Sequence, residues 1–279
     1  MRVKSRRPPL LHPHAPPPWR PPPRRAADRP DLKRDCESTM SSSSYKIIVR
    51  NLSQNALYFY VFQKRATFQP PVSAGSIFSS SLGCQSVGNY QGSGAQIVFG
   101  LDKQIYAGAI STAAPIPPTQ FKASISPGVS RFAVSTTSTA RPIALSDGSG
   151  GGSPANFTEL TADPLALSTP LYQAGIPAGA FAIKVPAYTP TPLPELVCGV
   201  AAMKADQTVI LSSFIAPVPN ATLNCTPEQI FFVKTGYKAT GDIVDYDESN
   251  SARCDFTTGF GTIIATYNSN GIFSTQGGP

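Results

Sequence analysis

Histidine is absent from residues 41–279 of this 279-residue chain, because both of its histidines, His12 and His14, lie near the N-terminus. Histidine is the commonest general base and the commonest metal ligand in proteins. Its absence excludes Ser-His-Asp and Cys-His catalysis from residues 41–279, and also histidine-ligated zinc, copper and iron sites. The only tryptophan, Trp19, lies in the same N-terminal stretch. Carboxylates, amides, hydroxyls and tyrosines therefore carry the remaining candidate chemistry.

Several other signatures are also missing. The sequence has no Walker loop, no Gly-x-Ser-x-Gly elbow, no dinucleotide fingerprint and no Cys-x-x-Cys spacing. It has no run of about 18 apolar residues for a membrane span. We therefore predict a protein that is not an enzyme, holds no metal ion or cofactor and does not cross a membrane.

The four cysteines after residue 40 bear on the cellular compartment; they are Cys84, Cys198, Cys225 and Cys254. No apolar run of signal-peptide length precedes the first strand pattern, so we expect a cytoplasmic protein with free thiols. Export by another route would reverse both expectations and would allow three disulfide pairings.

Residues 1–40 differ from the rest in charge and in proline content. They contain ten basic and four acidic residues, a net charge of +6, whereas residues 41–279 contain thirteen basic and twelve acidic residues. Ten prolines interrupt any helix there, so we predict a disordered basic tail. Three interpretations stay open: a start site placed upstream of Met40, an arm that contacts nucleic acid or membrane, and a mitochondrial transit peptide. Residues 41–279 carry almost no net charge, so we expect no nucleic-acid binding by the folded part.

From residue 41 onward the apolar residues recur with period two. In 45–50, Tyr45, Ile47 and Val49 share one face, and 230–233 is apolar on both faces, which is typical of a central strand. Residues 260–267 and 271–274 flank an Asn-Ser-Asn-Gly turn, which predicts a hairpin. Short runs of this kind recur about every ten residues. The pattern predicts an all-β fold, a two-layer antiparallel β-sandwich of the jelly-roll type.

We predict one domain over residues 41–279, with a flexible Gly/Ser loop at 147–153. The alternative is that this loop links two halves of the body, but all-β domains often reach 200–250 residues. Helix signals are poor, and the best candidate helix, residues 198–206, is short and contains Gly199.

A family resemblance rests on four segments: Tyr45-Lys-Ile-Ile-Val-Arg-Asn-Leu-Ser53, Phe59-Tyr-Val-Phe62, Pro70-Pro-Val-Ser73 and Asp255-Phe-Thr-Thr-Gly-Phe-Gly261. With these segments the chain resembles a group of fungal β-rich proteins that open with a Tyr-x-Val-x-Val-x-Asn-x-Ser strand. Those proteins have no assigned function, so the resemblance implies a fungal source and no catalytic residue.

The densest polar feature is the acidic segment, residues 241–255, which contains five of the twelve acidic residues of the body. Its candidate binding residues are Asp242, Asp245, Tyr246, Asp247 and Glu248. Carboxylates suit Ca²⁺, but the segment does not fit the EF-hand, because Asn250 replaces the glycine and Phe256 replaces the final glutamate. A carboxylate pair for glycoside hydrolysis is a second interpretation, and a solvated loop between strands is the favoured one.

Tyrosines are the other candidate, because an exposed tyrosine can stack on a sugar ring or anchor a partner protein. We predict a non-enzymatic binding or structural-interaction module whose partner is a protein or a glycan, with self-association through sheet edges as one mode. A lectin-like carbohydrate-binding module is the first alternative. A carboxylate-dependent hydrolase or lyase is the second.

Overall fold

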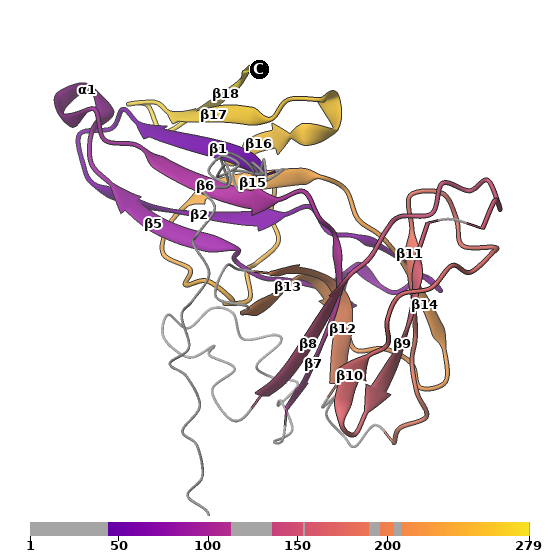
Figure 1. The fold of residues 1–279 in the computed structure, drawn as a ribbon. Helices are drawn as coiled ribbons and strands as arrows, with labels where there is room; N and C mark the ends of the chain where they lie inside the picture. Colours follow the sequence, from indigo (N-terminus) through magenta and orange to yellow (C-terminus); the bar gives the residue numbers. More distant parts are fainter. Residues whose placement is uncertain (1–43, 113–135, 153, 190–195, 204–207, 279) are drawn as a thin grey trace, which may run out of the picture. The chain divides into compact units, whose positions relative to one another are not determined.

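The computed structural model describes residues 44–112, 136–152, 154–189, 196–203 and 208–278. All of them belong to one compact unit, Ser42–Pro279. The predicted disordered tail, residues 1–40, lies outside the described residues. The secondary structure is almost entirely strand, with one short helix, α1 (Tyr90–Ser93), and two 3-10 turns, η1 (Ala74–Ser76) and η2 (Phe256–Thr258). The predicted all-β class is therefore confirmed (Figure 1).

Four open sheets contain the strands. The first has the order β18-β17-β1-β6 and the second the order β16-β15-β2-β5. The third has the order β10-β9-β11-β14-β3 and the fourth the order β4-β13-β12-β7-β8. Neighbouring strands are antiparallel except for the pairs β1–β17 and β9–β11. The bounds are β1 Ser44–Asn51, β2 Leu57–Gln63, β3 Thr67–Gln69, β4 Phe78–Ser79, β5 Gly83–Val87, β6 Ile97–Asp102, β7 Tyr106–Thr112, β8 Thr136–Pro142, β9 Phe157–Ala162, β10 Leu165–Leu167, β11 Phe181–Lys184, β12 Leu196–Met203, β13 Val209–Ile215, β14 Thr222–Thr226, β15 Ile230–Thr235, β16 Ala252–Asp255, β17 Thr262–Tyr267 and β18 Phe273–Gly278.

The sheets pack face to face in two pairs, so the predicted two-layer arrangement occurs twice. One core lies between the first and second sheets and includes Ile47, Phe59 and Phe231. The other lies between the third and fourth sheets and includes Phe181 and Val200. Burial of these apolar faces is the main force that holds each pair together.

Continuous chain segments join the two cores. β2 of the second sheet runs through residues 64–66 into β3 of the third sheet, and β14 returns through 227–229 into β15. β6 of the first sheet likewise runs through 103–105 into β7 of the fourth sheet. These crossings make residues 44–278 a single fold with two cores, and they frame the cavity described below.

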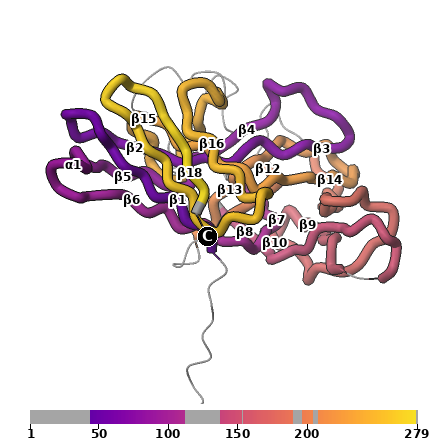
Figure 2. Tube along the Cα trace, turned by 90° about the horizontal axis from the view of Figure 1, so that it is seen from above, coloured from indigo at the N-terminus to yellow at the C-terminus, as the bar shows by residue number. Residues whose placement is uncertain are grey.

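The local patterns read from the sequence explain the strands that form. In β1, Ile47 and Val49 are fully buried while Lys46 is exposed, as the period-two pattern predicts. β15 lies between β16 and β2 and is buried on both faces, which confirms its predicted central position. The C-terminal hairpin is also confirmed, because β17 pairs with β18 across a turn in which Gly271 has a φ of 82°. Figure 2 shows the ends of the described chain, β1 and β18, near each other, and β17 pairs with both strands.

The candidate helix at 198–206 is wrong over its described part, because residues 198–203 belong to strand β12. This strand lies between β13 and β7, and its first six residues are buried. A Cβ at Gly199 would meet the carbonyl oxygen of Ser213 at 2.4 Å, so the glycine allows the two strands to approach closely. The apolar run of small residues fits a strand covered on both faces as well as a short helix, and the pairing with two neighbours decides between them.

The predicted flexible loop, described over residues 147–152, connects β8 of the fourth sheet to β9 of the third. Its turn is built by the carboxylate of Asp147, which accepts hydrogen bonds from the backbone N–H and the hydroxyl of Ser149. No helix in the described part of the chain is both long and apolar enough to cross a membrane.

Candidate functional site

The acidic segment lies mostly in the loop between β15 and β16, and backbone hydrogen bonds fix this loop to the crossing that joins β4 to β5. The N–H of Ser81 donates to the carbonyl of Asp242, and the N–H of Val244 donates to the carbonyl of Ser79. Val244 and Tyr246 then pack on the outer face of the second sheet, against Tyr60, Phe62, Ile230 and Phe232. The loop therefore acts as a cover over a sheet face that would otherwise be apolar and exposed.

The carboxylates of this loop are bound by neighbouring groups of the same chain. Asp247 accepts hydrogen bonds from the ammonium of Lys234 at 2.5 Å and from the hydroxyl and N–H of Ser249. These bonds hold the pKa of Asp247 well below its usual range. Asp242 accepts from the N–H of Ala239 at 2.9 Å. Each carboxylate thus completes the local structure of the loop.

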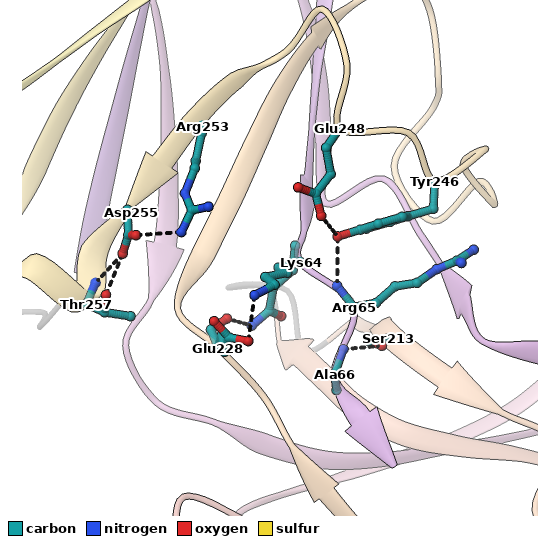
Figure 3. Close-up of polar contacts among 11 residues, drawn as sticks. Lys64, Arg65, Ala66, Ser213, Glu228, Tyr246, Glu248, Arg253, Asp255 and Thr257 are labelled. Atoms are coloured by element: carbon teal, nitrogen blue, oxygen red, sulfur yellow. Dashed lines mark hydrogen bonds and ion pairs between the residues drawn. The ribbon is translucent and has the colours of Figure 1, made fainter. Parts of the chain in front are cut away.

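Tyr246 is the anchor of the loop, and Figure 3 shows its hydroxyl between Glu248 and the backbone of Arg65. It donates to the carboxylate of Glu248 at 2.5 Å and accepts from the N–H of Arg65 at 3.4 Å. The guanidinium carbon of Arg65 lies 4.5 Å from the centre of the ring, and the ring meets those of Phe62 and Phe232 edge-on. Burial and the bond to Glu248 raise the pKa of Tyr246 above its usual value.

The remaining acidic residues point to other partners. Asp255 caps η2 through Thr257 and pairs with Arg253 at 2.9 Å, as Figure 3 also shows. Burial, with the nearby Asp245 and Asp247, raises the pKa of Tyr60 to about 12. Among the described residues, no group of three or more His, Cys, Asp or Glu side chains is placed to hold a metal ion.

The tyrosines separate into buried and exposed groups. Tyr60 is buried, whereas Tyr58 and Tyr237 are 48% and 64% exposed and form a pair with ring centres 5.2 Å apart. Their planes meet at 86°, so this pair forms a corner instead of a flat stacking platform.

A second polar region lies where the crossing strands meet, and we call it the junction cavity. Its volume is about 410 Å³. Its polar lining consists of Gln63 at the end of β2, Asp102 and Gln104 at the β6–β7 corner, and Gln229 before β15. Its apolar lining consists of Leu82, Leu101, Ile105, Met203, Ile210 and Phe231. This size and this mixture of apolar walls with few polar groups are typical of small-molecule sites.

The polar groups of the junction cavity keep unused hydrogen-bonding capacity. The side-chain amide of Gln229 has no partner among the described residues, and that of Gln63 uses one N–H, on the carbonyl of Glu228 at 2.8 Å. Gln104 uses both amide hydrogens, on the carbonyls of Ile105 and Ile143. Asp102 accepts from the N–H of Gln104 at 2.9 Å and from the hydroxyl of Tyr106 at 3.0 Å. Among the described lining residues, the exposed Asp102 is the only ionisable one.

The back wall of the cavity contains a β-bulge. The register between β12 and β13 shifts at Val200 and Ala201, and the unpaired residue, Ser212, donates its hydroxyl to the carbonyl of Val200 at 3.3 Å. Val200 and Ala201 both line the cavity. Bulges occur often beside functional sites, where they redirect a strand and its side chains.

Sequence reasoning selected the acidic segment and missed the junction cavity. The four polar residues of the cavity come from three distant parts of the chain, and only Asp102 and Gln104 are close in sequence. One local signal is present: Gly100 stands alone between Phe99 and Leu101 in a strand pattern, which can mark a place where a ligand approaches the backbone.

No family model, no curated protein and no solved structure matches the chain.

Proposed function

We propose that this protein is a non-enzymatic binding module and that the junction cavity is its ligand site. The observation that carries the proposal is a cavity of about 410 Å³ whose Gln229 amide is left without a partner among the described residues. An amide in a concave, mostly apolar site gains most from a ligand that completes its hydrogen bonds.

The arrangement of charges supports binding without catalysis. General acid–base hydrolysis of glycosides needs two carboxyl groups on either side of the scissile bond, whereas the described lining residues include one carboxylate, that of Asp102. In the acidic loop, Asp247 and Glu248 are held by Lys234 and Tyr246 respectively. A hydrolase or lyase built on that loop would first have to release these contacts.

The test uses ligand-observed NMR with a fragment library balanced between neutral, cationic and anionic compounds. The blocking variant is Gly100→Met, because Gly100 lines the cavity and no atom lies within 4 Å of a Cβ built there. Gly88→Met is the matched control, since Gly88 also has open space around its Cβ and does not line the cavity.

We expect a set of fragments that bind the parent protein and Gly88→Met but not Gly100→Met. Thermal melting of all three proteins checks that the blocking variant is folded. If no fragment shows this dependence on Gly100, the junction cavity is not a ligand site and the proposal fails.

A further inference from the structure

The hydrogen-bonding groups left over in the junction cavity indicate which class of ligand it takes. Resting on the proposed function, we infer that the ligand is an uncharged, hydroxyl-rich molecule about the size of a hexose. Three features lead to this class: the count of unused donors and acceptors, the charge of the lining, and the combination of polar groups with apolar walls.

Unused acceptors and unused donors occur together. The free acceptors are the side-chain oxygens of Gln63, Gln104 and Gln229 and the remaining lone pairs of Asp102, and the free donors are N–H groups of Gln63 and Gln229. A hydroxyl group donates one hydrogen bond and accepts up to two, so several hydroxyls satisfy such a mixed set. A carboxylate or phosphate group only accepts, and it would leave the acceptors of the cavity unpaired.

The charge of the described lining residues disfavours an anion and gives little to a cation. Among the described residues that line the cavity there is no lysine or arginine, and the nearby Lys103 has its ammonium 5.1 Å from the ring centre of Tyr45. An anion would therefore face Asp102 with no opposite charge. Among the described lining residues, a cation would meet one carboxylate, which already accepts bonds from Gln104 and Tyr106. Phe231 is the one aromatic side chain among them, so they form no aromatic cage.

The polar side chains of the cavity come from two parts of the fold, and apolar side chains complete the lining. Asp102 and Gln104 come from the β6–β7 corner, whereas Gln63 ends β2 and Gln229 precedes the neighbouring strand β15. Apolar side chains, among them Ile210 of β13, line the rest. A ring that carries both hydroxyl and C–H groups suits this mixed lining, because the amides can pair with hydroxyls and the apolar side chains can contact C–H groups.

The experiment compares sugars that share one ring and differ in charge: glucose, its anionic analogue glucuronate and its cationic analogue glucosamine. Galactose, mannose and myo-inositol extend the neutral set. Binding to the full chain is measured by saturation-transfer NMR and by calorimetry. We expect at least one neutral compound to bind, and the Kd of glucuronate to be at least about tenfold higher than that of the best neutral compound.

Two pairs of variants locate the binding. Gly100→Met should abolish it and Gly88→Met should not. Gln229→Leu should raise the Kd of the neutral compound by about tenfold or more, because it removes polar groups that no described residue uses. Gln276→Leu, an exposed glutamine of β18 outside the cavity, should have no effect.

The outcomes separate the ligand class from the proposed function. If glucuronate or glucosamine binds as tightly as any neutral compound, and Gly100→Met removes that binding, the inferred class is wrong and the ligand site stands. If no compound of this series binds in a way that depends on Gly100, the class is also wrong, and the fragment screen decides the ligand site separately. If a neutral compound binds and the binding depends on Gly100 and on Gln229, the result supports both the inferred ligand class and the proposed ligand site.

Discussion

The acidic loop and the junction cavity are two polar regions in the described part of the chain, and they differ in how many of their polar groups lack hydrogen-bond partners. In the loop, Asp247 is bound by Lys234 and Ser249, and Glu248 is bound by Tyr246. In the cavity, Gln229 has no side-chain partner among the described residues, although the sequence gives it no prominence. Free hydrogen-bonding capacity, more than density of charge, therefore marks the better candidate site.

The two regions also differ in what supports them. The loop rests on aromatic packing at the edge of one sheet, whereas the back wall of the cavity consists of central strands whose backbones are in close contact. Changes to the wall should therefore cost more stability than changes to the loop, and the predictions below follow that order.

The largest effect is expected from Gly199→Ala in β12. The added Cβ would lie 2.4 Å from the carbonyl oxygen of Ser213 and 2.8 Å from the Cα of Phe214, and both are backbone atoms that cannot rotate away. We expect a loss of about 3 kcal/mol in the free energy of unfolding, measured by urea denaturation. Gly100→Ala is the control, with no atom within 4 Å of its Cβ, and should change stability by no more than about 0.5 kcal/mol. Equal losses in the two variants would contradict the close-packed wall.

A smaller effect is expected from Tyr246→Ala in the acidic loop. The change removes a half-buried ring from its contacts with Phe62, Phe232 and Arg65, and should cost about 2 kcal/mol. Tyr246→Phe keeps the ring and loses only the hydroxyl bonds to Glu248 and Arg65, so it should cost about 1 kcal/mol.

Thiol alkylation of the Tyr246→Ala variant shows whether the loss of stability is confined to the acidic loop. Cys84 packs beneath the loop, and burial raises the pKa of its thiol above the usual value. An open loop should lower that pKa toward normal and speed the reaction of Cys84. Cys225 lies fully buried in the other core and serves as the internal control. Faster alkylation of both thiols would show that the whole fold had loosened, and the loop would then not be an independent cover.

A third effect, smaller again, concerns the ion pair between Lys234 and Asp247. The pKa of Asp247 is lowered chiefly by Lys234 and further by Ser249, so Lys234→Met should raise it only part of the way to the normal value. A carboxyl whose pKa is lowered by folding adds stability at pH values above its unfolded pKa of about 3.9, and this contribution disappears as the pH falls further. NMR titration of the Asp247 carboxyl measures the shift directly. An unchanged pKa in Lys234→Met would show that the ion pair does not form in solution.

Some features of the fold could be predicted from sequence because neighbouring residues determine them. The alternation of Ile47 and Val49 with Lys46 predicted β1, and the Asn-Gly turn predicted the hairpin of β17 and β18. β12 could not be distinguished from a helix, because its character depends on neighbours on both sides that are distant in sequence.

Prediction of the functional site from sequence meets the same limit as prediction of β12, as the two polar regions show. The acidic segment was visible because its charges are adjacent, but the partners that engage it, Lys234 and Arg65, lie outside it and their roles appear only in the folded chain. The junction cavity could not be predicted because Gln63, Asp102 and Gln229 are distant in sequence and come together only at the ends of β2, β6 and the segment before β15. Local sequence patterns thus predict the strands, whereas the site depends on contacts between residues that are distant in sequence.

The smallest expected effect is that of calcium on the acidic loop, where we predict no change in the melting temperature. A calcium site needs several oxygens free to converge on one ion, and those of Asp242, Asp247 and Glu248 already accept hydrogen bonds from the chain. Exposed carboxylates attract cations only diffusely, and salt screens the attraction.

The measurement is thermal melting in millimolar Ca²⁺ against a chelator. It compares the parent protein with Asp245→Asn/Asp247→Asn and with a control, Glu159→Gln/Asp163→Asn, which removes two acidic groups elsewhere. A site with a Kd tenfold below the free calcium concentration would stabilise the fold by about 1.4 kcal/mol, which melting readily detects. If Ca²⁺ raises the melting temperature of the parent and of the control but not of Asp245→Asn/Asp247→Asn, the loop is a cation site after all. The contrast between a loop whose carboxylates are already hydrogen-bonded and a cavity whose amides have free groups would then be wrong. The calcium ion would have replaced Lys234 as the partner of the Asp247 carboxylate.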